Sequence, residues 1–376
     1  MNVCGLSRLA PLLLGACAAL PSHAHGDEAA AAARLPQRVA LLARAQAELE
    51  RGDANQALDD FERAAMMLHA SDAELGLIRA AMQDGQYRRA LAFCAHTAGE
   101  HADDADGGAL YAWLLRIGGQ GELATRVLAQ TRAQAPDDPV AAAVEAAFAA
   151  SPSVAAGVLL APPHRMAPWP VAPDGQAPPP ATARFAGNAT LVDDGAAALL
   201  PLAAIDAAPS VRVWVRNGLG QTTPATLDRG DATLVSRGLA RLSLRTPLPV
   251  GASQAAAGRA PFAGSPGYAV QFGAGSEPAW PTLTQGFLGG PIGASDLRKL
   301  GFGSTPGAPV LDAKGALIGI VLAAASGQTT WLPLASSMPS PAGVPAPPAG
   351  RALVAPDEIY EAGLRRALQV LIGGPR

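Results

Sequence analysis

The chain has 376 residues, of which 49% are hydrophobic and 16% are charged, and its formal net charge at pH 7 is −3. A chain of this length can form two domains that each bury a core. It carries no long run of lysine and arginine, which argues against a nucleic-acid or anionic-membrane surface.

Residues 1–24 predict a secretory signal peptide. Arg8 precedes an apolar run from Leu9 to Leu20, and small residues follow it. Two cleavage sites fit: Ser22-His23-Ala24 suits a signal peptidase, whereas Leu14-Gly15-Ala16-Cys17 resembles a lipobox that would make Cys17 a lipid anchor. No other stretch reaches about 18 apolar residues, so no spanning helix is expected. We expect an exported protein of the periplasm or cell envelope, with the soluble form favoured over the lipoprotein.

Residues 36–150 contain a helical repeat with a period of 33 or 34 residues. The repeat begins with a glycine, has an alanine five residues later and an apolar residue four further on. The glycine allows a turn, the alanine allows two helices to approach, and the apolar residue fills the next groove. The repeated positions are Gly52, Ala57 and Phe61, then Gly85, Ala90 and Cys94, then Gly119, Ala124 and Leu128.

This repeat resembles the tetratricopeptide family, as three units followed by a capping helix. An unrelated helical bundle is the alternative, because the aromatic residue usual near the repeat start is missing in the first two units. The resemblance implies a concave groove that binds an extended peptide or a helix of a protein partner. Cys94, in a helical pattern, is expected to be a buried hydrophobic residue.

Residues 161–181 contain eight prolines and predict an extended, semi-rigid spacer between domains. Residues 182–337 then carry short candidate strands bounded by glycine turns. The segment "VRVWVR" alternates, with valines on one face. Strands at this spacing predict an all-β barrel or sandwich, and hence a multidomain protein with an α-helical N-terminal half and an all-β C-terminal half.

The order of these strands resembles the trypsin-like serine peptidases, especially their bacterial periplasmic branch. The segment "GSTPGAPVLDAKGALIGI" is the most specific match, and "GLARLSL" takes the place of an Asp-Leu-Ala-x-Leu-x-Val stretch. The resemblance implies a double barrel and places the general base near Leu202, its orienting Asp at Gly238 and the nucleophile at Pro306. All three catalytic residues are therefore expected to be lost, and the chain is expected not to be an enzyme.

The histidines give the same indication without an alignment. They are His23, His25, His69, His96, His101 and His164, and none lies within the β region. A serine nucleophile needs a nearby base, usually imidazole, and proline also lacks the N–H that an oxyanion hole requires. Two rescues remain open: Ser304 or Thr305 paired with Lys299 or Lys314, and His164 reaching into the barrel from the linker.

The chain ends with a second proline-rich spacer, residues 338–355, and a predicted helix, residues 356–373. Pro356 can start this helix, and Gly373 can stop it. The apolar stripe of the helix can pack on the barrel or on a partner or the repeat domain. No cofactor or metal motif occurs, so none is expected.

These features together predict an exported pseudoprotease that serves as a protein-binding adaptor or scaffold. A periplasmic peptide-binding chaperone or regulator and a diverged active endopeptidase are the alternatives.

Overall fold

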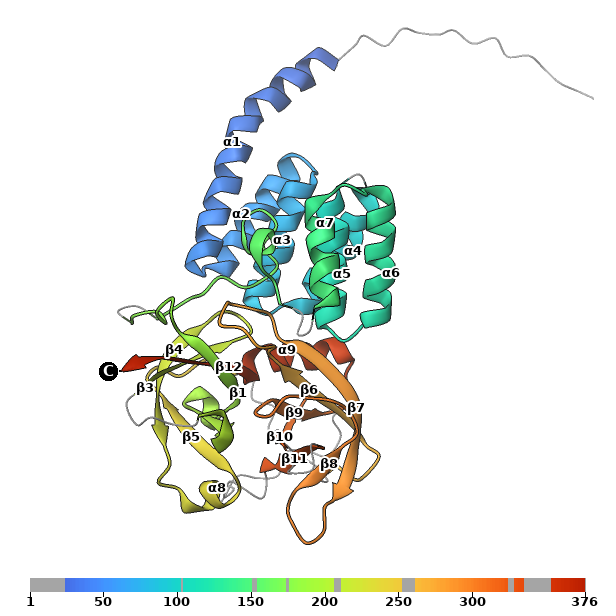
Figure 1. The fold of residues 1–376 in the computed structure, drawn as a ribbon. Helices are drawn as coiled ribbons and strands as arrows, with labels where there is room; N and C mark the ends of the chain where they lie inside the picture. The colour runs from blue at the N-terminus through green and yellow to red at the C-terminus, as the bar shows by residue number, and fades with distance from the viewer. Residues whose placement is uncertain are drawn as a thin grey trace, which may run out of the picture.

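The computed structural model describes residues 24–102, 104–150, 154–173, 176–205, 211–251, 261–323, 328–334 and 353–375, and the side chains of these residues except 24–33 and 375. The predicted signal peptide, with Cys17, and most of the spacer 338–355 lie outside the described residues, apart from Ala24. Helices precede strands along the chain, and the helices stand on one end of the β region (Figure 1). The fold is therefore a helical N-terminal part joined to a β region of two closed six-stranded barrels.

The N-terminal helices pair into antiparallel hairpins, with a last helix packed beside the third hairpin. Their bounds are α1 (Ala24–Arg51), α2 (Ala54–Met67), α3 (Ser71–Asp84), α4 (Tyr87–Glu100), α5 (Ala105–Ile117), α6 (Gly121–Gln134) and α7 (Pro139–Ala149).

Each hairpin turns at one of the repeated glycines. Gly52, Gly85 and Gly119 all adopt positive φ, between +82° and +89°, which side chains other than glycine rarely adopt. The repeated alanines are fully buried, and so is Cys94, whose burial raises the thiol pKa well above its ordinary value. The small residues thus sit where adjacent helices approach closely.

The three glycine turns also face the β region. A Cβ atom on Gly52 would lie 2.4 Å from Val171 Cγ2, and one on Gly85 would lie 2.8 Å from an Arg365 guanidinium nitrogen. A Cβ atom on Gly119 would lie 3.3 Å from the carbonyl oxygen of Leu283 in the second barrel. The helices therefore dock through their turns, end-on, as Figure 1 shows.

The described strands close into two antiparallel barrels, in the orders β1-β12-β3-β4-β5-β2 and β10-β11-β8-β7-β6-β9. The first barrel contains β1 (Arg184–Val192), β2 (Ala197–Pro201), β3 (Val211–Asn217), β4 (Thr222–Asp228), β5 (Leu239–Leu244) and β12 (Ala367–Pro375). The second contains β6 (Pro266–Gln271), β7 (Thr282–Pro291), β8 (Arg298–Leu300), β9 (Pro309–Asp312), β10 (Leu317–Ala323) and β11 (Thr329–Pro333). Short helical turns are η1 (Gly157–Leu160), η2 (Asp193–Gly195), η3 (Leu202–Ala204) and α8 (Ala232–Ser236).

The predicted helix 356–373 is wrong beyond its first half. Helix α9 (Pro356–Arg366) ends at Arg366, and the chain continues as β12, which pairs with both β1 and β3. Leu368, Val370 and Ile372 alternate into the core of the first barrel. Ala367, Leu368 and Leu371 also fit the apolar stripe of a helix. The sequence therefore did not reveal the alternation of every second residue that is typical of a strand.

Helix α9 packs on the helical array and the barrels together. The Tyr360 hydroxyl donates a hydrogen bond to the Pro281 carbonyl at 2.6 Å, and its ring meets the Tyr87 ring edge-on at 4.6 Å. The Gly218 N–H donates to the carbonyl of Leu364 at 2.7 Å. Of the two predicted docking surfaces, the barrel and the repeat domain, this helix uses both.

The spacer predicted at residues 161–181 is wrong for its first part, which is packed rather than extended. Residues 154–169, the wedge segment, bury Leu159, Met166 and Ala167 in one core with the helices and the second barrel. The Arg165 guanidinium donates to the Leu160 and Pro168 carbonyls, and burial lowers its pKa to about 10. The prolines restrict the backbone of this segment, which here favours a connection packed against the domains over a flexible linker.

Among the described residues, no helix combines the length and hydropathy needed to cross a membrane.

Candidate functional site: the junction between the two barrels

The three positions that the sequence resemblance predicts for a catalytic triad, Leu202, Gly238 and Pro306, belong to segments near the contact between the barrels. The Leu202 N–H donates to the Gly238 carbonyl at 2.9 Å, which joins η3 to the start of β5. A Cβ atom on Gly307, directly after Pro306, would lie 3.1 Å from Pro201 Cδ, beside Leu202. Gly238 adopts φ +76° in the turn that follows α8. Leucine, glycine and proline carry none of the imidazole, carboxylate and hydroxyl groups that a catalytic triad requires.

The loop that carries Pro306 is held against β1. Gly307 has φ +92°, and a Cβ atom on it would lie 1.9 Å from the Asn188 carbonyl oxygen. Its N–H donates to the Val321 carbonyl at 2.8 Å, and its carbonyl accepts from Thr190 Oγ1 at 2.9 Å. Glycine is required here because any side chain would push the loop off the strand.

Asn188, a buried amide in the middle of β1, fastens the first barrel to the second. Its Nδ2 donates to the Phe272 carbonyl at 3.2 Å and to Thr305 Oγ1 at 3.0 Å. Its Oδ1 accepts from the Phe272 N–H at 2.7 Å. A buried amide with its polar atoms partnered fixes one relative position of the two barrels.

The hydroxyls of Ser304 and Thr305, next to Pro306, both donate hydrogen bonds to a neutral side chain. Gln271 Oε1 accepts from Ser304 Oγ at 2.8 Å, from Thr305 Oγ1 at 3.0 Å and from the Thr305 N–H at 2.6 Å. An amide oxygen does not take up a proton near neutral pH, so it cannot act as the general base that a nucleophile needs. The N–H directly before Pro306 is also occupied, which leaves Pro306 and Thr305 without a free oxyanion donor.

Neither sequence-based rescue is assembled in the structure. Lys299 lies in β8 opposite Thr330, and Lys314 lies in the turn between β9 and β10. The structure shows no hydrogen bond between Ser304 and either of these described lysines. His164 does not enter the barrel, because its Nδ1 lies 2.6 Å from Asp106 Oδ2 in helix α5.

Apolar side chains complete the contact between the barrels. Val192 and Leu199 of the first barrel form one buried cluster with Ile320 and Leu332 of the second. The barrels are therefore joined by this apolar cluster and by the hydrogen bonds of Asn188, whereas Gln271 holds the Pro306 loop within the second barrel.

Sequence reasoning missed Asn188 and Gln271. Asn188 interrupts the otherwise apolar and small residues of β1, and a polar residue inside a strand that is buried is a signal for a partnered amide. Gln271 has no comparable signal, because its partners Ser304 and Thr305 are more than thirty residues away along the chain.

Comparison with known proteins adds little beyond the fold. No protein-family profile matches the chain, and no curated protein matches it. One similar solved structure is the protease domain of MamO from Magnetospirillum magneticum in its apo form, with 18% sequence identity and a TM-score of 0.31. The alignment covers 43% of this chain and 92% of that one.

Proposed function

We propose that this chain is an exported, non-catalytic relative of the trypsin-like peptidases and acts as a protein-binding adaptor through its helical repeats. The observation that carries the proposal is the bonded junction: the loop of Pro306, the residue that we align with the nucleophile, is locked onto β1 through Gly307. The β region also lacks histidine throughout. Without a base or a nucleophilic hydroxyl that a base could activate, peptide hydrolysis has no chemical route there.

The barrels then serve as a rigid support for the repeats. Gln83 of α3 donates from Nε2 to the carbonyls of Trp169 and Leu219, and it accepts from the Trp169 N–H at 2.8 Å. Arg88 pairs with Glu358 and Glu361 of α9, each at 3.1 Å. These contacts fix the array relative to the barrels, so a partner bound to one is presented in a defined orientation to the other.

Two faces of the helical array are already used within the chain. The glycine turns face the barrels, and the wedge segment lies against α3 and α5 through contacts of Arg79 with Pro163 and of Asp106 with His164. Because the barrels and the wedge segment already occupy these faces, we expect a partner of the repeats to bind another surface, and not the groove that the resemblance implies.

The first hairpin offers such a surface. Val39 of α1 is 62% exposed, and Met66 of α2 is 79% exposed. The two residues are a similar number of positions before and after the Gly52 turn, which joins these antiparallel helices. Leu35 of α1 and Leu68, directly after α2, are also exposed, at 49% and 48%. Large apolar side chains exposed together are typical of protein interaction sites. We assign the partner-binding surface to these four residues.

The test is capture of envelope proteins by purified mature chain, with the variant Val39→Asp/Met66→Asp beside the wild type. The matched control is Phe287→Asp, which places the same charge at a 63% exposed apolar position in the second barrel. We expect a reproducible partner that the hairpin variant loses and the control retains. Loss in the control alone would instead favour a peptide-binding role of the barrel.

A further inference from the structure

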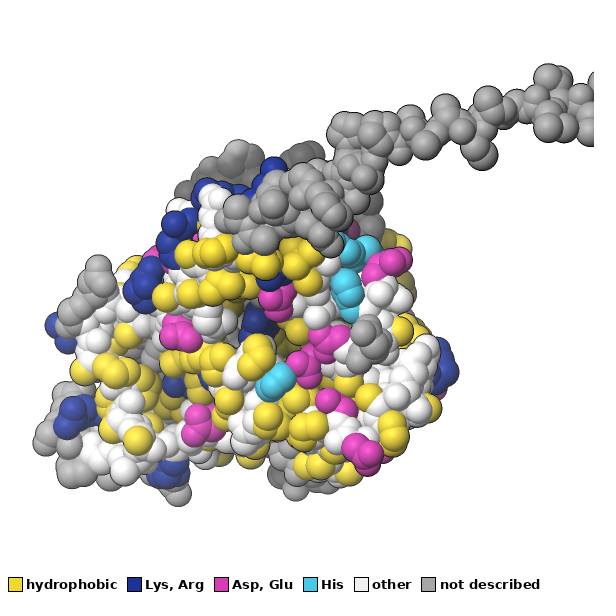
Figure 2. Space-filling model, turned by 90° about the horizontal axis from the view of Figure 1, so that it is seen from above, with side chains coloured by type: hydrophobic (Ala, Val, Ile, Leu, Met, Phe, Trp, Pro, Cys, Tyr) yellow, Lys and Arg dark blue, Asp and Glu magenta, His cyan; other side chains and the backbone are white. Residues whose placement is uncertain are grey.

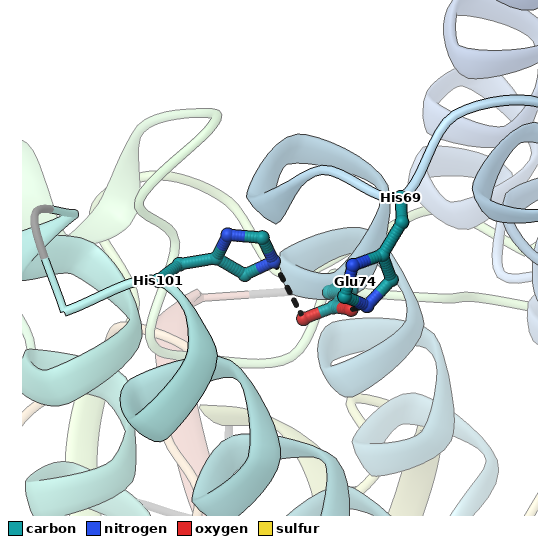
Figure 3. Close-up of side chains that lie close together, drawn as sticks. All are labelled: His69, Glu74 and His101. Atoms are coloured by element: carbon teal, nitrogen blue, oxygen red, sulfur yellow. Dashed lines mark ion pairs between the residues drawn. The ribbon is translucent and has the colours of Figure 1, made fainter. Parts of the chain in front are cut away.

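Three histidines surround one buried glutamate at the outer end of the helical array. His69 lies in the connection between α2 and α3, Glu74 in the first turn of α3, and His96 and His101 near the end of α4. Figure 3 shows His69 and His101 approaching the Glu74 carboxylate from opposite sides. The six histidines of the chain include only one other, His164, whose side chain the structure describes. Most described imidazoles therefore gather at this one place.

The imidazole nitrogens converge on the two carboxylate oxygens. Glu74 Oε1 lies 2.6 Å from His69 Nε2 and 3.4 Å from His96 Nε2, and Glu74 Oε2 lies 3.6 Å from His101 Nε2. The Nε2 atoms of His69 and His96 are 3.2 Å apart. His101 Nε2 is buried and has no hydrogen-bond partner among the described residues.

The carboxylate lacks the partners that usually compensate a buried negative charge. The Glu74 side chain is only 5% exposed, and the ion pairs it makes with described residues are those with the three histidines. Thr97 Oγ1 adds one hydrogen bond at 2.7 Å. A buried carboxylate needs a compensating positive charge, and neutral imidazoles do not supply it. A bound cation would.

The distances suit a tetrahedral metal ion. Two ligands about 2.0–2.2 Å from one Zn²⁺ ion at the tetrahedral angle lie about 3.4 Å apart. The His101–Glu74 separation falls near this value, and the ligand atoms of His69, Glu74 and His101 all lie within 4.8 Å of one another. The shorter His69–Glu74 contact must lengthen when both groups ligate one ion.

We propose that His69, Glu74 and His101 bind one divalent transition-metal ion, with Zn²⁺ as the best match. Two imidazole nitrogens and one carboxylate oxygen favour this class over Mg²⁺ and Ca²⁺, which prefer oxygen ligands alone. This contradicts the expectation from the sequence that the chain has no metal site. It does not depend on the proposed function.

The site is open to entry from solvent. The side chains of His69 and His96 are 57% and 48% exposed. Figure 2 shows histidine side chains at the surface of the array when it is viewed from above. A bound ion would tie the α2–α3 connection to the end of α4, and because Leu68 precedes His69, it would also order the edge of the apolar surface on the first hairpin.

The experiment is Co²⁺ titration of the purified mature chain, followed by visible absorption, with Zn²⁺ competition. We expect one equivalent of Co²⁺ to give the intense bands of a tetrahedral site and Zn²⁺ to displace it. His69→Gln and His101→Gln should each weaken binding more than about 100-fold, since loss of a ligand exceeds the loss of an outer-shell partner. His164→Gln is the matched control and should bind as the wild type does.

Three results would overturn the proposal. The first is absence of tetrahedral Co²⁺ bands in the wild type. The second is equal binding by the wild type and both ligand variants, which would place the ion elsewhere, such as at histidines near the N-terminus. The third is equal weakening in the control. Glu74→Gln is a further check, because it keeps the size of the side chain and removes the charge that the cation would neutralise; unchanged affinity in this variant would also count against the site.

Discussion

The barrel junction and the outer end of the helical array handle their polar groups in opposite ways. At the junction, Asn188 and Gln271 satisfy hydroxyls and backbone groups with neutral amides, and apolar residues fill the remaining contact. At the array end, a buried carboxylate faces three imidazoles, and large apolar residues are exposed nearby. In the region whose sequence resembles an enzyme, the polar groups are thus already hydrogen-bonded within the chain. The helical repeats, by contrast, carry the groups that can bind an ion or a partner.

The largest expected effect comes from ending the chain after Arg366. This removes β12, leaves β1 and β3 without a shared neighbour and takes Leu368, Val370 and Ile372 out of the first barrel. Because an open barrel exposes its core and its strand edges, we expect loss of cooperative folding, measured by circular dichroism and size exclusion. A chain ending at Gly374 should fold normally, and folding of the shorter chain would show that the junction does not need a closed first barrel.

Gly307→Ala should be strongly destabilising. Its Cβ atom would lie 1.9 Å from the Asn188 carbonyl oxygen, and φ is +92°. We expect a loss of about 3 kcal/mol in the free energy of unfolding by urea, from combined overlap and backbone strain. Gly303→Ala, with no atom within 4 Å of the added Cβ, is the control. Equal stability of the two variants would mean that the loop is not locked onto β1.

Tyr360→Phe tests whether the array and the barrels unfold together. It leaves the buried Pro281 carbonyl without the donor that lies 2.6 Å away. We expect a loss of about 1–2 kcal/mol within a single unfolding transition. Tyr268→Phe, at a half-buried position in β6, should change stability less. Two separate transitions in the Tyr360 variant would instead show that the contrasted regions are independent.

The smallest effect should be the pH dependence of Asp60→Asn. A hydrogen bond from Arg44, aided by the charges of Arg44 and Arg63, holds the pKa of the Asp60 carboxyl below its ordinary value. A lowered pKa in the folded state gives stability that is present above the unfolded pKa and is lost as pH falls through the folded one. The variant should therefore have a lower Tm than the wild type at pH 7, with a smaller gap near pH 3. An equal Tm difference between the wild type and the variant at both pH values would contradict a stabilising ion pair between Asp60 and Arg44.

Local patterns were enough to predict much of this fold, because the residues that carry them act on near neighbours. Gly85 and Ala90 report a turn and a helix contact within five residues, and "VRVWVR" reports its own barrel face. Contacts between distant segments leave no such pattern. The sequence from Leu368 to Ile372 fits a helix or a strand equally well until β1 and β3 are in place. The prolines of residues 161–169 do not reveal that Met166 and Ala167 between them pack into the core.

The candidate sites likewise contain some features that the sequence predicts and others that depend on contacts between distant segments. Replacement of the triad at Leu202, Gly238 and Pro306 stays a prediction from aligned motifs. The amides at the junction depend on tertiary packing, and so do the histidines that meet Glu74 from 22 and 27 residues along the chain or from the preceding connection. A single sequence holds their identities but not their proximity.

The most direct test of the central claim is incubation of the purified mature chain with casein and with a fluorophosphonate serine probe. The account predicts neither cleavage nor labelling, because Ser304 and Thr305 donate to Gln271 and no imidazole lies in the β region. Cleavage or labelling that Ser304→Ala abolishes would contradict it and would mean that the chemistry has moved by two residues from Pro306.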